Sequence, residues 1–240
     1  MPLFPEGRVT MPRRLLIQSC CLLALIGFSS RFPARGEDAV SSPQNATEKS
    51  NSEFESLFDG NTFDRWQGDE KWFRVEDRAI VGGSLNERIP HNFFLSSEAI
   101  YDDFELTLEF RLKGDQTNAG IQLRSQRIPG HHEMIGYQAD LGQSYWGCLY
   151  DESRRNRILA APEPQKIAAV LKKEDWNSYR ILCEGARIRL WINDLQTVDY
   201  TEVENEIPQT GHIALQIHGG PPGEAWYRNI RLRRLSARTE

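Results

Sequence analysis

Strict alternation of apolar and polar residues in three segments is the feature that most constrains this fold. Residues 211–218 place Ile213, Leu215 and Ile217 on one side of an extended chain, and residues 120–124 and 137–141 alternate in the same way. Because a strand reverses its side chains at every residue, each segment has one core face and one polar face. The polar faces carry Gln122, Arg124, Gln138, Asp140, His212, Gln216 and His218.

If these three strands share a sheet, amide, carboxyl, guanidinium and imidazole groups gather on one surface. Such a surface can bind a polyol and move its protons. Three ordinary amphipathic strands with solvated outer faces would give the same alternation. The pattern therefore predicts a shared polar surface, with Arg124 near Asp140 or His218, and does not by itself establish a function.

The first 36 residues have the order of a secretory signal peptide. The basic residues Arg13 and Arg14 precede an apolar run from residue 15 to residue 28, and Ala34-Arg35-Gly36 offers a cleavage site. The apolar run is short for a membrane span, although an uncleaved anchor is the alternative. We therefore expect export to the periplasm or the extracellular space, with no membrane span in the mature chain.

The mature chain is acidic and contains two cysteines. Residues 37–53 are polar and are expected to form a disordered linker, so the folded domain spans residues 54–237. Residues 37–240 carry 24 basic and 33 acidic side chains, which is a poor match for nucleic acid or anionic lipid. Cys148 and Cys183 could form a disulfide or remain small buried thiols.

Short strand-like segments dominate residues 54–237. The clearest is residues 104–112, in which five apolar residues alternate with Glu, Thr, Glu and Arg. Further strands are expected at residues 72–75, 79–81, 176–183, 187–192 and 226–235. The one helix candidate, residues 167–173, could equally be a strand. We predict an all-β fold, a two-sheet antiparallel jelly-roll sandwich.

Residues 54–66 (FESLFDGNTFDRW) resemble the opening of the 3-keto-disaccharide hydrolase domain family. Further similar segments follow in the family's order and extend the resemblance over residues 54–235; they are residues 103–106, 118–121, 124–125, 147–152, 176–179, 191–193, 215–219 and 227–230. The resemblance implies a concanavalin A-like jelly roll, export, and cleavage of glycosidic bonds in 3-keto-glycosides or 3-keto-disaccharides.

The implied chemistry assigns roles to four side chains. A ketone at C3 acidifies the C2 proton, so a base could form an enolate that expels the C1 substituent, after which water adds. His218 is the candidate base, Arg124 the oxyanion partner, and Asp140 or Glu152 the acid. Direct hydrolysis by two carboxyl groups is the rival mechanism. Each of these side chains could instead serve only a structural ion pair or hydrogen bond.

Candidate substrate-binding residues extend this list. They are Gln122, Gln138, Gln216, Tyr150, Trp146 and Trp191, of which the two tryptophans could stack on a sugar ring. Metal ligands are unknown: a divalent cation is an open alternative, but His131, His132 and Glu133 cannot converge if they lie in a regular strand. A carbohydrate-binding or adhesion module without turnover is the alternative function, because this architecture hosts both.

The leader gives the first testable prediction. We expect cleavage near Gly36, so that N-terminal sequencing of the exported protein begins at or close to Glu37. A secreted or periplasmic protein whose first residue is Met1 or Met11 would contradict cleavage.

Overall fold

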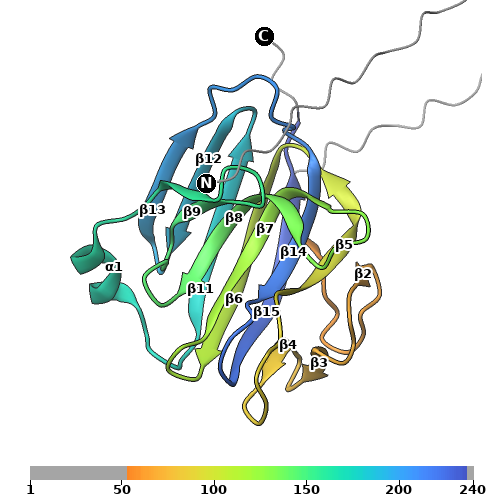
Figure 1. The fold of residues 1–240 in the computed structure, drawn as a ribbon. Helices are drawn as coiled ribbons and strands as arrows, with labels where there is room; N and C mark the ends of the chain where they lie inside the picture. Colours follow the sequence, from red (N-terminus) through yellow and green to blue (C-terminus); the bar gives the residue numbers. More distant parts are fainter. Residues whose placement is uncertain (1–52, 237–240) are drawn as a thin grey trace, which may run out of the picture. The chain divides into compact units, whose positions relative to one another are not determined.

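Two β-sheets packed face to face form the fold, seen in a computed structural model that describes residues 53–236 (Figure 1). The predicted leader (1–36) and the linker up to residue 52 lie outside the described residues. The first sheet has the spatial order β13 (Leu195–Thr201), β12 (Arg187–Ile192), β11 (Asn177–Glu184), β6 (Phe104–Lys113), β15 (Gly223–Arg234), β4 (Ala79–Ser84), β3 (Phe73–Glu76), with β1 (Glu55–Ser56) paired to β15.

The second sheet has seven strands and carries most of the predicted polar residues. Its order is β10 (Arg157–Ala160), β9 (Leu149–Glu152), β8 (Met134–Gly142), β7 (Asn118–Arg127), β14 (Gly211–Ile217), β5 (Phe93–Tyr101), β2 (Trp66–Gln67). All strand pairs in both sheets are antiparallel. The predicted two-sheet antiparallel sandwich is confirmed.

The helix candidate is helical over part of its predicted length. Helix α1 (Pro164–Val170) begins with a proline, which suits the first turn because that turn needs no N–H donor there. It contacts β13 at the edge of the sandwich (Figure 1). Within residues 53–236, no helix is long and apolar enough to cross a membrane.

The core lies between the inner faces of the two sheets. In β6, the alternation predicted from the sequence buries Phe104, Leu106, Leu108 and Phe110. Across the sandwich, Ile121, Leu123, Ile213, Leu215 and Ile217 of the second sheet are fully buried. Cys148 and Cys183 are buried free thiols, so the two do not form a disulfide.

A bulge in β7 reverses the direction of Arg124. The pairing of β7 with β8 shifts register between Leu123 and Gln126, and Arg124 has a φ of 49°. Such a bulge inserts one residue and changes which face the next side chains occupy. Ser125 therefore takes the outer position beside Gln122, to which its hydroxyl donates at 2.7 Å.

Arg124 consequently joins the two sheets at one end of the sandwich. Its guanidinium forms an ion pair with Asp103 at 2.8 Å and donates to the carbonyl oxygens of Asp102 and Gly185, both at 2.7 Å. Only 1% of its side chain is exposed. The prediction that Arg124 shares a surface with Asp140 and His218 is wrong, and the bulge is the reason.

This geometry predicts a large loss of stability for Arg124→Ala. Removing a buried guanidinium leaves two carbonyls without this donor and leaves the Asp103 carboxylate with the Gly185 N–H at 2.8 Å, so we expect a loss of about 3 kcal/mol in the free energy of unfolding. The matched control is Arg187→Ala, because the Arg187–Asp199 pair is half exposed and its removal should lower the stability much less. Urea unfolding of both variants measures the difference; equal losses would contradict the buried role of Arg124.

Candidate active site

A polar pocket of about 220 Å³ lies on the outer face of the second sheet, over β7, β8 and β9. It is lined by Asn118, Gln138, Asp140, Gln143, Tyr145, Tyr150, Glu152 and His218. Five of these residues, namely Gln138, Asp140, Tyr150, Glu152 and His218, are side chains that the sequence singled out. The pocket brings them together from two strands, β8 and β9, and from the residue that follows β14.

Strand alternation explains how these side chains reach one surface. Ala139 and Leu141 of β8 are fully buried in the core, so Gln138 and Asp140 must point outward. Gln138 pairs with Tyr150 in β9, and Glu152 lies two residues further along that strand. His218 follows β14 directly, and its backbone N–H donates to the carbonyl of Asn118 at 3.0 Å, which holds it beside the start of β7.

A row of hydrogen bonds fixes the floor beside the pocket. The side-chain oxygen of Gln122 accepts a hydrogen bond from the Ser125 hydroxyl, and its amide nitrogen donates to the side-chain oxygen of Gln138 at 2.6 Å. Gln138 in turn hydrogen-bonds to the Asp140 carboxyl group. The Gln138 side chain lies so close to Gly120 that a Cβ there would approach it to 2.7 Å. Gln122 therefore acts beneath the pocket, by orienting Gln138.

Burial raises the pKa of both carboxyl groups in the pocket. The pKa of Asp140 lies well above its ordinary value because burial disfavours the charged form, and nearby Glu152 adds repulsion. The pKa of Glu152 rises to about 7, first through burial and then through repulsion from Glu133. Among the described residues that line the pocket there is no lysine or arginine to offset these charges. Glu152 can therefore hold or release a proton close to neutral pH, and Asp140 favours its protonated form more than an exposed carboxyl group does.

Glu133 approaches the pocket from the loop before β8. Its carboxylate accepts from the Asn92 amide at 3.0 and 3.2 Å and lies 3.1 Å from Nε2 of His132. His132 stacks between His91 and His131, with ring centroids 4.2 and 4.3 Å away. The Glu133 carboxylate in this loop thus repels the charged form of Glu152 and helps to raise its pKa. Within residues 53–236, no three or more His, Cys, Asp or Glu side chains are arranged to hold a metal ion.

The hydrogen bond of His218 determines which ring nitrogen is free. Its Nδ1 lies 2.7 Å from the carbonyl oxygen of Gly219. A carbonyl can only accept, so Nδ1 carries the proton in the neutral ring and Nε2 carries the lone pair. The side chain is exposed at the pocket wall, and this arrangement suits a base.

Four other predicted residues lie outside the pocket lining, in addition to Arg124. Trp191 lies on the outer face of the first sheet, where its ring contacts the guanidinium groups of Arg180 and Arg189. The prediction that Trp191 joins this site is wrong, because β12 belongs to the opposite sheet. Trp146 packs toward Phe110 in the core, with ring centroids 6.2 Å apart, and lines a different cavity.

Gln216 and Gln122 lie on the same outer face but below the surface, and both are fully buried. Gln122 has the hydrogen bonds described above. The amide nitrogen and oxygen of Gln216 have no hydrogen-bond partner among the described residues. Gln216 is adjacent to Gly120 in the pairing of β14 with β7, and it does not line the pocket.

Sequence reasoning missed Asn118, Gln143 and Tyr145. Asn118 has the same parity as Gln122 in β7, so extending the alternation by two steps would have found it. Gln143 and Tyr145 lie in the loop between β8 and β9, where alternation predicts nothing. Tyr145 packs edge-to-face on Tyr150 at 6.2 Å, and only the folded loop brings the two rings together.

The raised pKa of Glu152 predicts a pH-dependent stability difference. Glu152 has an ordinary unfolded pKa of about 4.3 and a folded pKa of about 7, so the unfolded chain releases its proton first. The wild type should therefore lose stability relative to Glu152→Gln as pH rises from about 4 to 7.

Urea unfolding at pH 5 and pH 8 tests this sign. The stability gap in favour of Glu152→Gln should be larger at pH 8, whereas the exposed control Glu87→Gln should show no such change. A gap for Glu152→Gln that is the same at both pH values would contradict the raised pKa.

Comparison with solved structures shows the same fold in proteins of several kinds. A proposed glycosyl hydrolase from Parabacteroides distasonis aligns with a TM-score of 0.58 and 18% identity, over 76% of this chain and 94% of that one. A galectin-like protein of unknown function from Bacillus subtilis gives 0.56 and 12%, over 73% and 92%. The carbohydrate-binding module CBM66 from Bacillus subtilis gives 0.55 and 14%, over 70% and 95%. These likenesses establish the jelly-roll fold.

No curated protein matches the sequence. A family model does: the 3-keto-alpha-glucoside-1,2-lyase-like domain matches residues 53–233, which is most of the chain and nearly all of its described part. The protein therefore belongs to the 3-keto-disaccharide hydrolase family.

Proposed function

We propose that this protein is an enzyme that cleaves the glycosidic bond of 3-keto-glycosides in the polar pocket of the second sheet. One observation carries the proposal: a histidine with a free Nε2 and two carboxyl groups with raised pKa values converge in one pocket. Among the described residues, no lysine or arginine lines this pocket. Perturbed carboxyl groups beside a base are typical of acid–base catalysis. Family membership supplies the substrate class.

The reaction begins with loss of the C2 proton. His218 accepts that proton at Nε2, and the electron pair moves to the C3 oxygen as an enolate. Burial favours the protonated form of Asp140, which can donate a hydrogen bond to this oxygen. Asp140 thus takes the position in the mechanism that the sequence had suggested for Arg124.

The second step breaks the C1–O bond. The enolate re-forms the ketone and expels the C1 substituent, whose oxygen takes a proton from Glu152. Water then adds across the C1–C2 double bond: Glu152 takes a proton from the water as the water oxygen bonds to C1, and protonated His218 returns a proton to C2. The net reaction is hydrolysis. Glu152, with a pKa of about 7, can give and take a proton near neutral pH. The amides of Asn118 and Gln138 and the rings of Tyr145 and Tyr150 are placed to hold the sugar.

Turnover of methyl 3-keto-glucoside, compared with methyl glucoside, tests the proposal. We expect release of methanol only from the keto sugar, and deuterium at C2 of the product formed in D₂O. Product incubated alone corrects for exchange without enzyme. Hydrolysis without C2 deuterium would favour direct displacement by two carboxyl groups. Saturable binding without turnover would favour the carbohydrate-binding alternative.

His218→Ala should lower kcat by about 10² or more, because general-base catalysis contributes about that much. His212→Ala is the matched control. His212 lies in β14, the strand that ends directly before His218, and its Nδ1 also bonds a carbonyl, that of Ser97, yet it does not line the pocket. Both variants should keep the wild-type melting temperature within a few degrees. Activity of His218→Ala within a few-fold of wild type would show that the base lies elsewhere.

A further inference from the structure

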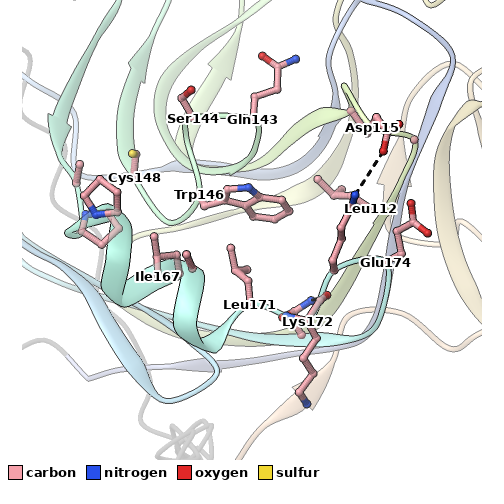
Figure 2. A pocket seen from close by; sticks show the side chains of 18 of the residues that line it. Leu112, Asp115, Gln143, Ser144, Trp146, Cys148, Ile167, Leu171, Lys172 and Glu174 are labelled. Carbon is pink, nitrogen blue, oxygen red and sulfur yellow. Dashed lines mark hydrogen bonds and ion pairs between the residues drawn. The ribbon is translucent and has the colours of Figure 1, made fainter.

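A second and larger cavity, of about 620 Å³, opens at the edge of the sandwich beside α1. Figure 2 shows Trp146 in its middle, with Ile167 and Leu171 on one side and Leu112 on the other. This volume lies in the range of small-molecule sites, which are mostly apolar with a few polar groups. Polar groups gather at the rim, where Asp115 lies 3.5 Å from the ammonium of Lys173.

The walls of this cavity are fixed by hydrogen bonds. The Asn193 amide donates to the carbonyl of Val170 at the end of α1, at 2.8 Å, and the Asn177 amide donates to the carbonyl of Lys172 at 2.9 Å. Behind Trp146, the ring of Phe110 closes the core side. Burial raises the pKa of the lining Cys148 thiol to about 11, so this group stays neutral. The cavity is thus a preformed apolar site.

One short loop, residues 143–148, separates this cavity from the polar pocket. Its side chains alternate between the two spaces: Tyr145 lines the polar pocket, Ser144 and Trp146 line the apolar cavity, and Gln143 lines both. The loop is tied to Asp140, whose carbonyl accepts from Gly147 and whose N–H donates to Cys148, both at 3.0 Å. Gln143 is thus the side chain at which the polar pocket and the apolar cavity adjoin.

We propose that this cavity binds the leaving group of the glycoside, and that the leaving group it fits is a planar aromatic aglycone. The proposal rests on the proposed function, because it places the sugar in the polar pocket with C1 directed toward Gln143. A flat ring can stack on Trp146 while Ile167, Leu171 and Leu112 contact its edges. A second sugar would leave its hydroxyl groups against these apolar side chains without partners.

Binding of 1-naphthol, measured by calorimetry, tests the cavity independently of turnover. Wild type and the control Trp191→Ala should bind equally, whereas Trp146→Ala should bind at least tenfold more weakly. Ala168→Phe, which fills the cavity from the exposed side of α1, should also lose at least tenfold and guards against a folding defect in Trp146→Ala. No naphthol binding to wild type, or equal binding by all four proteins, would overturn the proposal.

Kinetics with 1-naphthyl and methyl 3-keto-glucoside connect the cavity to the reaction. Trp146→Ala should lower kcat/KM for the naphthyl substrate at least tenfold more than for the methyl substrate, and Trp191→Ala should change neither. If both substrates turn over and Trp146→Ala affects them equally, the aglycone site is wrong and the proposed function stands. If neither substrate turns over, the proposed function fails and the aglycone role fails with it.

Discussion

The two-faced character of β7, β8 and β14 is the constraint on which both the core and the candidate site depend. Each of Ile121, Leu141 and Leu215 is fully buried, which stabilises the fold by about 1.5–3 kcal/mol per side chain. A slip of one residue in any of these strands would turn its apolar side chains outward and its polar side chains into the core. In β8 the polar side chains are Gln138 and Asp140. The core thereby sets the register that delivers the polar side chains to the outer face.

The contrast between Asp140 and Asp151 indicates what the outer face is built for. Asp151 is fully buried on the inner side of β9, and its carboxylate is held by Arg154 and Arg155. Asp140 is almost as buried, yet its polar partners are the Leu141 N–H at 2.9 Å and the Gln138 side chain. The chain therefore neutralises a buried carboxylate where the role is structural. At the pocket it leaves two carboxyl groups with raised pKa values, which destabilises the fold near neutral pH. Such a loss of stability is typical of functional sites.

Much of this arrangement could be predicted from the sequence, because alternation is a local property. It gave the strands, the sandwich and the outward direction of Gln138, Asp140 and Gln216. It failed for Arg124, since the bulge that turns this residue inward is stabilised by Asp103 and Gly185, 21 and 61 residues away. It also failed for Trp191, because alternation gives a strand two faces but does not say which sheet contains it. Loop residues such as Tyr145 have no periodicity to detect.

The loop of residues 143–148 links the chemistry of the second sheet to the packing of the first. Gly147 has a φ of 70°, and a Cβ there would lie 2.8 Å from the methyl group of Thr197 in β13. A side chain at this position would therefore move the loop away from the first sheet. Because Gly147 donates to the carbonyl of Asp140 and Trp146 packs toward Phe110, such a movement would shift the acid in the polar pocket and the ring in the apolar cavity together. The geometry of the candidate site thus depends on a contact between the edges of two sheets, and not on the site's own strand alone.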